Sequence, residues 1–362
     1  MNKGLRILIL SPTAFPSITG NAATTERWRQ SLENKGCTIQ VMATRDLNVT
    51  DLLDAIQYFK PDIIHAYHAL HSGVFLLDPR VSEACDGLPI VVSLPGTDAD
   101  LETATPNRKD TILKVCRNAN TITAQSNIII DHLKANLSEL DDRIFYVPKA
   151  PSWIGNDVFD LRGFAGCRPG DVLFFLPAGI RPVKGNLECL TAFKKVRQAS
   201  PRARIVFAGQ ILDTDYGTLF QEELTGCTTF ASWIRSIAPA AMRAAYEGAD
   251  IVLNSSFSEG LSNVLLEAIS AGKPLLASDI PSTRRLVLGE QKNVPCGVLY
   301  NPHDPDDLCR KALELINNES LRGSMAGAAR NRALVLPTPA DEANALIEVY
   351  KTAKSGELRA KS

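Results

Sequence analysis

The chain has 362 residues, more than one hydrophobic core normally serves, and a prior of roughly 150 residues per domain predicts two domains. Apolar residues make up 45% of the sequence, enough for two cores. The formal net charge of −1 and the isoelectric point near 6.5 argue against a nucleic-acid-binding protein, whose surface should be markedly basic.

The cysteines and the apolar runs bear on the compartment. The eight cysteines are scattered, the two nearest being Cys296 and Cys309, so no short metal-ligand spacing such as CxxC is present. Reduced thiols and a cytoplasmic location are the simplest interpretation. The apolar run at 7–10 is short for a signal peptide and indicates a buried first strand. No run of eighteen apolar residues exists, so no transmembrane span is expected, although peripheral membrane attachment stays open.

Short apolar runs alternate with helical patterns along the chain, which predicts α/β structure with parallel sheets. In the first half, the expected strands are 5–10, 38–43, 63–65, 90–94, 121–123 and 144–147. A stretch rich in proline and glycine then breaks the pattern. In the second half, the expected strands are 172–176, 204–208, 228–231, 251–253, 275–277 and 297–300.

Two Rossmann-like, doubly wound domains facing a central cleft follow from this order. We expect an N-terminal domain at 1–150, a linker at 151–170 and a C-terminal domain at 171–335. After residue 301 the chain turns helical to 354. The segment 336–362 is expected to hold a final helix, from about Thr338, and a frayed tail.

The segment 258–268 carries two carboxylates, Glu259 and Glu267, separated by a turn that opens a helix directly after the apolar run 251–253. Backbone N–H groups at a helix start lack partners and carry partial positive charge, so a diphosphate can dock there. Carboxylates accept hydrogen bonds from sugar hydroxyls. The pattern therefore indicates a nucleotide-sugar site, the alternative being exposed helix charges. The turn consists of Gly260, Leu261, Ser262 and Asn263.

Positive charge comes from Arg181 and Lys184, which follow the apolar strand expected at 172–176. Ligands of open α/β sheets collect at the carboxyl ends of strands, so both side chains should face a crevice and stabilise a departing diphosphate without a metal. Gly179 and Gly185 would let the backbone approach the ligand closely. The alternative is that both are solvated loop cations.

The pattern R-x-x-K-G, followed about eighty residues later by S-E-G-x-x-x-x-x-L-E-A-x-x-x-G-K-P, resembles the retaining glycosyltransferases of family 4. These enzymes carry the glycosyltransferase group 1 domain and have the GT-B fold. Within them the chain is most similar to the glycosyltransferase 1 domain-containing proteins and, more distantly, to the selenosugar synthases. That similarity rests on 67–69, 96–98, 179–184 and 254–256.

The resemblance implies that 1–150 is the acceptor-side domain, that 171–335 binds the nucleotide sugar, and that the final helix in 336–362 crosses back to the N-terminal domain. It also implies a role for each matching residue on the donor side. Glu259 would contact the sugar hydroxyls, Glu267 the ribose, and Arg181 with Lys184 the diphosphate. The amides of 260–263 would contact phosphate and sugar. His68 would lie near the donor sugar. Further donor contacts are implied for Gly20 in the loop after the first strand, for Gly179, and for Trp233 and Ile234 in the segment that reads the base.

On the acceptor side the candidates are Asn21, His71, Thr97 and Asp98. Thr97 and Asp98 follow an expected strand, so they either orient the acceptor or His68, or form an Asx turn that caps the next helix. The spacing of His65, His68 and His71 invites a metal-site interpretation, which we reject because no carboxylate or cysteine joins them at ligand spacing.

The sequence thus predicts a metal-independent transferase without a cofactor that moves a sugar, with retention, from a nucleoside diphosphate to an unidentified acceptor. Family frequency favours a UDP-sugar as donor; the acceptor is a small molecule, a glycan or a lipid-linked molecule. Two alternatives are a nucleotide-sugar epimerase or hydrolase and a non-catalytic nucleotide-sugar-binding protein. A nicotinamide dehydrogenase is excluded because no G-x-G-x-x-G follows the first strand. The oligomeric state is left open.

Overall fold

The computed structural model describes residues 4–17, 19–96, 105–151, 153–289 and 294–355. The chain divides into two compact units. Unit 1 contains Met1–Ala150 and Pro337–Ser362, and unit 2 contains Pro151–Leu336. Unit 1 is therefore built from both ends of the chain, whereas unit 2 is one continuous segment.

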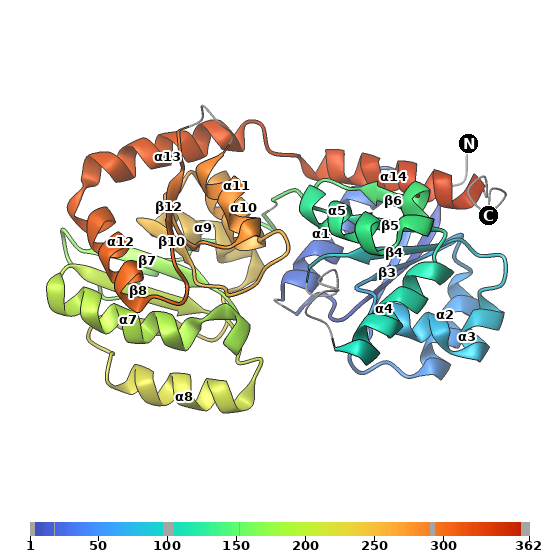
Figure 1. Ribbon diagram of the computed structural model, residues 1–362, viewed down its shortest axis with the longest axis horizontal. Coiled ribbons are helices and arrows are strands. Elements are labelled where there is room, and N and C mark those ends of the chain that lie inside the picture. Colours follow the sequence, from blue (N-terminus) through green and yellow to red (C-terminus); the bar gives the residue numbers. More distant parts are fainter. Residues whose placement is uncertain (1–3, 18, 97–104, 152, 290–293, 356–362) are drawn as a thin grey trace. The chain divides into compact units, whose positions relative to one another are not determined.

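Unit 1 is organised around a sheet of six parallel strands in the order β2-β1-β3-β4-β5-β6 (Figure 1). In β1, Ile7 and Ile9 point into one hydrophobic cluster, and Leu8 and Leu10 into another. Both faces of the sheet are thus buried, as expected for a parallel sheet. The strands are β1 (Arg6–Ser11), β2 (Thr38–Ala43), β3 (Ile63–Tyr67), β4 (Ile90–Leu94), β5 (Thr121–Ala124) and β6 (Ile144–Tyr146).

Several helices of unit 1 begin at side chains that satisfy their first backbone N–H groups. Thr19 accepts from the N–H of Ala22 at 3.2 Å, and Asn48 accepts from that of Asp51 at 2.9 Å. The helices are α1 (Gly20–Glu33), α2 (Val49–Phe59), α3 (Pro79–Ala84), α4 (Pro106–Asn118), α5 (Asn127–Asn136) and α14 (Pro339–Ser355), with 3₁₀ turns η1 (Gly73–Leu77) and η2 (Ser138–Arg143).

The last helix, α14, completes the core of unit 1. Its Leu346, Val349 and Tyr350 are buried against β1, β3 and α1, and each such side chain contributes about 1.5–3 kcal/mol by leaving water. Glu342, fully buried, accepts hydrogen bonds from Arg27 Nε (2.6 Å), Trp28 Nε1 (2.7 Å) and Gln125 Nε2 (2.8 Å). One carboxylate therefore ties the C-terminal helix to α1 and to the loop after β5.

Unit 2 repeats the doubly wound design with the strand order β12-β11-β10-β7-β8-β9, all parallel. The predicted fold class, two doubly wound α/β halves, is confirmed. In β7 alternate residues again serve two clusters, with Phe174 on one face and Phe175 on the other. The strands are β7 (Val172–Pro177), β8 (Ala203–Ala208), β9 (Ala231–Ile234), β10 (Ile251–Asn254), β11 (Leu275–Ser278) and β12 (Gly297–Tyr300).

Helices cover both faces of this second sheet (Figure 1). One face is covered by α7, α8 and α12, and the other by α6, α9, α10 and α11. The helices are α6 (Leu161–Phe164), α7 (Asn186–Ala199), α8 (Thr214–Thr225), α9 (Met242–Gly248), α10 (Asn263–Ser270), α11 (Pro281–Leu288), α12 (Pro305–Asn317) and α13 (Glu319–Ala333), with 3₁₀ turns η3 (Pro182–Lys184) and η4 (Pro239–Ala241).

Strand order identifies where each sheet is built to bind a ligand. In unit 2 the order reverses between β7 and β10, and in unit 1 it reverses between β1 and β3. At such a switch point the loops leave toward opposite faces and open a crevice at the carboxyl ends of the strands. The loops after β7 and β10 are those that carry the predicted donor motifs.

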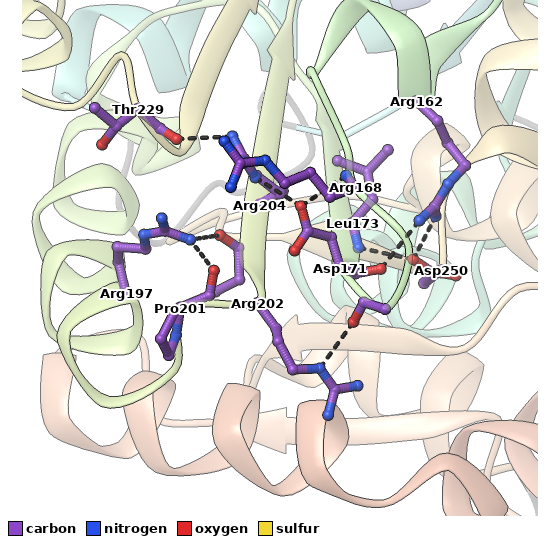
Figure 2. Close-up of polar contacts among 12 residues, drawn as sticks. Arg162, Arg168, Asp171, Leu173, Arg197, Pro201, Arg202, Arg204, Thr229 and Asp250 are labelled. Atoms are coloured by element: carbon purple, nitrogen blue, oxygen red, sulfur yellow. Dashed lines mark hydrogen bonds and ion pairs between the residues drawn. The ribbon is translucent and has the colours of Figure 1, made fainter.

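An arginine-rich cluster lies at the other end of the unit 2 strands, at the amino-terminal ends of β7 and β8 (Figure 2). Arg204 Nε donates to Asp171 Oδ2 at 3.0 Å, and Arg162 Nη1 to Asp250 Oδ2 at 2.7 Å. Arg202 Nε donates to the carbonyl of Gly170 at 2.8 Å. These guanidinium groups fasten the turns that enter the strands, so their role is structural.

Several local expectations require correction. The strand expected at 228–231 is β9, Ala231–Ile234, because Phe230 and Ala231 donate to the carbonyl of Cys227 and form a turn there. The linker expected at 151–170 contains α6, whose Leu161 packs against α9. Among the described residues, no helix is long and apolar enough to cross a membrane.

Candidate functional site

The two donor motifs, far apart in the sequence, meet at the switch point of unit 2. Phe257 donates its N–H to the carbonyl of Val183 at 2.9 Å. Ser255 Oγ donates to the carbonyl of Lys184 at 2.7 Å. These bonds fasten the loop after β10 to the loop after β7, so the side chains of both loops share one site.

An ion pair joins the two motifs. Lys184 Nζ lies 2.5 Å from Glu259 Oε1, and the two side chains are only 16% and 12% exposed. Burial acts to raise the pKa of Glu259, but the charge of Lys184 and hydrogen bonds from Lys184, Ser256 and Asn254 outweigh it. The pKa of Glu259 is therefore lowered, and the carboxylate is ionised at neutral pH.

Arg181 stands beside this pair at the start of the turn η3. Its backbone N–H donates to Asn186 Oδ1 at 3.3 Å. Within the described part of the chain, the buried Arg181 Nε and Asn186 Nδ2 have no hydrogen-bond partner. Buried donors are nearly always satisfied, so two unmet donors in one turn mark a place where a ligand or water is expected.

Glycine lets the two loops come together. Gly185 has φ +61°, and a Cβ there would lie 2.4 Å from the carbonyl oxygen of Ser255. Gly179 is less restricted, since an added Cβ would meet Leu212 Cδ1 at 2.5 Å, the end of an exposed side chain that can shift. Any larger residue at 185 would be strained by its backbone conformation and would push the loop of Glu259 away from Lys184.

The start of α10 follows Glu259 directly. Ser262 is the N-cap residue, yet its side chain makes no capping bond to the first turn; its Oγ accepts from Asn254 Nδ2 at 3.3 Å. The positive end of the helix dipole therefore lies at the turn Gly260–Leu261, close to Glu259. Gly260, Leu261 and Asn263 are half-buried. This arrangement suits an anion next to a sugar.

Glu267 lies on α10 and is held by a buried tyrosine. Tyr246 donates its hydroxyl to Glu267 Oε2 at 2.6 Å. Burial, followed by the charge of Glu267, raises the pKa of Tyr246, so the phenol remains a donor. Tyr246 thereby fixes the direction of the Glu267 carboxylate.

Trp233 and Ile234 lie on the edge strand β9. The indole Nε1 donates to the carbonyl of Gly209 at 2.9 Å, and the ring meets Phe220 edge to face at 6.1 Å. The guanidinium of Arg235 lies 6.0 Å from the centre of the indole ring. The half-buried side chain of Trp233 is therefore held in a fixed orientation, and its indole N–H already donates a hydrogen bond.

In unit 1, His68 directly follows β3 at the switch point. Its φ of +89° is unusual for a residue with a side chain, and such strain is concentrated at functional sites. Burial and the charge of Arg108 lower the pKa of His68 to about 4, so the ring is neutral at pH 7. The N–H of His71 donates to His68 Nδ1 at 3.3 Å, which places the ring proton on Nε2.

The other candidate site residues of unit 1 are exposed, half-buried or outside the described residues. Gly20 is exposed and Asn21 half-buried, and both begin α1, where a loop was expected. His71 is exposed beside His68, with 4.5 Å between the ring centroids. Thr97 and Asp98 lie outside the described residues. Over the ranges that the structure describes, no three His, Cys, Asp or Glu side chains gather as metal ligands.

His65, by contrast, lies within β3 and serves the core. Its ring stacks on Trp28 at 5.0 Å, Nδ1 meets the Tyr350 hydroxyl at 2.8 Å and Nε2 meets Ser93 Oγ at 2.7 Å. Full burial lowers its pKa to about 3. His65 is therefore a neutral packing residue that connects β3 to α14.

Sequence reasoning missed the side chains that hold the predicted ones. Asn254, Ser256, Asn186 and Tyr246 are all buried and each contacts a predicted site residue. Their signal in the sequence was weak, because polar residues at a strand end also occur in ordinary turns. Asn254 and Ser256 served only as marks of family resemblance.

Comparison with known proteins agrees with this geometry. A family model described as Glycosyl transferases group 1 matches residues 170–318, which hold both donor motifs. The chain is 24% identical over 338 residues to glycosyltransferase 1 domain-containing protein 1 of Xenopus tropicalis, covering 90% of this chain and 92% of that one. It is 31% identical over 151 residues to the sulfoquinovosyl transferase SQD2 of Arabidopsis thaliana, spanning 41% of this chain but 27% of the relative.

Solved structures share the fold at low identity. HepE from Anabaena, crystallised with UDP and glucose, has a TM-score of 0.73 at 15% identity, covering 96% of this chain and 100% of HepE. The sucrose-phosphate synthase of Thermosynechococcus elongatus has a TM-score of 0.74 at 16% identity, covering 99% and 100%. Residues 170–318 therefore match the group 1 glycosyl transferases, and the chain as a whole is similar to glycosyltransferase 1 domain-containing protein 1 and shares the GT-B fold of these solved structures.

Proposed function

We propose that this protein transfers a sugar from a UDP-sugar, with UDP-glucose as the first candidate, to an acceptor hydroxyl with retention of anomeric configuration. The observation that carries the proposal is the joined cluster of Arg181, Lys184 and Glu259 at the switch point of unit 2. HepE has been crystallised in complex with UDP-glucose and shares this fold, which supports the choice of donor.

In this scheme the cations act on the leaving group. Breaking the glycosyl bond leaves a second negative charge on the β-phosphate, and fixed cations in a half-buried site stabilise that charge more than they stabilise the intact donor. The buried Arg181 Nε, which lacks a partner in the described structure, and Lys184 Nζ are the donors we assign to the diphosphate. Because they supply two positive charges, we propose that turnover needs no metal and survives EDTA.

We assign orientation of the sugar to Glu259. Glu259, ionised beside Lys184, accepts a hydrogen bond from a sugar hydroxyl. His68 is neutral with its proton on Nε2, so we assign it hydrogen-bond donation rather than proton abstraction. Glu267 accepts from the ribose hydroxyls, and the leaving diphosphate takes the acceptor's proton.

The test is a panel of nucleotide sugars followed by product analysis. Thermal shift with UDP-, GDP- and ADP-sugars should show stabilisation by UDP-glucose; stabilisation by no nucleoside diphosphate contradicts the site. Product analysis then separates three activities. An α-glycoside of an added acceptor indicates retaining transfer, free glucose indicates hydrolysis, and an altered nucleotide sugar indicates epimerisation.

A further inference from the structure

The carboxylate of Glu259 is held by one oxygen only. Three donors converge on Oε1: Lys184 Nζ at 2.5 Å, Ser256 Oγ at 2.7 Å and Asn254 Nδ2 at 3.3 Å. No hydrogen bond to Oε2 is found from any residue that the structure describes. Glu259 is thus fixed at one oxygen and can accept a ligand hydroxyl at the other.

The orientation of the Asn254 amide is set by its neighbours. Asn254 Oδ1 accepts from the N–H of Ser256 at 3.3 Å and from Ser278 Oγ at 3.5 Å. Its Nδ2 donates to Glu259 Oε1 and to Ser262 Oγ. The reverse orientation would set an NH2 group against an N–H, so only this one satisfies the network.

Ser256 is fixed as firmly. It is 1% exposed, and its carbonyl accepts from Ser278 Oγ at 2.6 Å. Ser278 closes β11 and is itself fully buried, while Thr283 Oγ1 donates to the Ser278 carbonyl at 2.5 Å. The two neutral donors to Glu259 are therefore anchored at the end of β10 and by Ser278 at the end of β11, in addition to the bonds that join this loop to the one carrying Lys184.

On the basis of the proposed function, we infer that Asn254 and Ser256 are positioning residues that keep Glu259 directed at the donor sugar when Lys184 is engaged by the diphosphate. Lys184 cannot serve Glu259 alone once a doubly charged leaving group is present, because the diphosphate competes for the same ammonium. The two neutral donors do not interact with phosphate in this way. They hold Oε1 and leave Oε2 for a sugar hydroxyl throughout the reaction.

This role makes a prediction that a general loss of folding does not make. Asn254 and Ser256 act only on the group that reads the sugar, so their removal should weaken binding of UDP-glucose and spare binding of UDP. A hydrogen bond to a charged group accounts for roughly a tenfold change in affinity or more. A disturbed loop would weaken both ligands together.

The experiment is calorimetric titration of the full chain with UDP and with UDP-glucose, for wild type, Ser256→Ala and Asn254→Ala. In each variant the dissociation constant for UDP-glucose should rise about tenfold while that for UDP stays within about twofold of wild type. Two matched controls lie elsewhere in unit 2. Thr191→Val removes a hydroxyl that donates to Glu223, and Asn318→Ala removes the cap of α13; both should leave the two constants in their wild-type ratio.

Three results would overturn the inference. Parallel weakening of UDP and UDP-glucose in the variants would show a merely structural role. Unchanged binding of both ligands would show that Lys184 alone suffices. Failure of the wild type to bind either ligand would remove the donor assignment together with this inference, and the wild-type titration shows that case directly.

Discussion

The two switch points of this chain use different chemistry on the same architecture. In unit 2 the loops after β7 and β10 bring together Arg181, Lys184 and Glu259, a cluster rich in charge. In unit 1 the loop after β3 presents His68, which is neutral, and α1 presents Gly20 and Asn21. The comparison teaches that one architecture can carry a charged cluster at one switch point and a neutral ring at the other, because the loops and not the sheet supply these side chains.

Both loops hold a residue with positive φ, but for different reasons. Gly185 adopts +61° where a side chain would strike the Ser255 carbonyl. His68 adopts +89° despite its side chain, and the fold holds it there by burial and by the N–H of His71. In unit 2, Gly185 thus allows two loops to come close. In unit 1, a strained backbone conformation sets the direction of the His68 ring.

The largest expected effect falls on the charged switch point. Arg181→Ala combined with Lys184→Ala should lower kcat/KM about 10⁴-fold, because each donor to a developing charge contributes roughly 10²–10³-fold. Steady-state kinetics with UDP-glucose measure the loss. The control pair Arg202→Ala and Lys195→Ala removes two cations elsewhere in unit 2 and should leave the rate intact. A wild-type rate in the variant that lacks both Arg181 and Lys184 would contradict the role assigned to these two cations.

Next in size is the buried charge of unit 1, which serves structure. Glu342→Ala removes the carboxylate of a buried ion pair with Arg27, and breaking such a pair costs about 3–5 kcal/mol. Chemical unfolding should show the loss. Glu348→Ala, on the same helix but 71% exposed and paired at the surface with Lys351, is the matched control and should change little. Equal effects from the two would mean that α14 is not held by this carboxylate.

Gly185→Ala should have a smaller effect, about 1–3 kcal/mol of stability, because of the left-handed backbone and the close Ser255 carbonyl. Affinity for UDP-glucose should fall as well, since the Lys184 loop must shift. Gly323→Ala, in α13 where no atom lies within 4 Å of the added Cβ, should instead stabilise by about 0.5–1 kcal/mol. Thermal unfolding distinguishes the opposite signs.

The smallest expected effect is on the pH dependence of stability, through the neutral imidazole of His68. Burial lowers the pKa of His68 to about 4, so between pH 6.5 and 4 the unfolded chain binds a proton that the folded chain does not. Stability therefore falls as pH drops through this window. His68→Gln should remove about 1–2 kcal/mol of the loss between pH 7 and 5. The exposed His132→Gln should keep the wild-type slope, and an unchanged slope in His68→Gln would contradict the neutral assignment.

Sequence patterns identified the fold and the charged cluster because both leave short-range marks. Strand alternation revealed both sheets, and the run from Glu259 to Glu267 gave the helix start after β10. Patterns could not predict where β9 starts, because its start depends on the turn at Cys227. They also could not predict α6, which packs against α9. The holders of Glu259 and Glu267, namely Ser256, Asn254 and Tyr246, emerge only when distant strands and helices meet.

The division of the chain also has a consequence for engineering. Pro151–Leu336 is inserted as one block between two parts of unit 1, with junctions after Ala150 and before Pro337. The corresponding block of another protein with this fold can be exchanged at these two peptide bonds while the first and last segments stay native. Chimeras joined at one junction only would combine the unit 1 sheet of one protein with the α14 of the other, although α14 completes the core of that sheet.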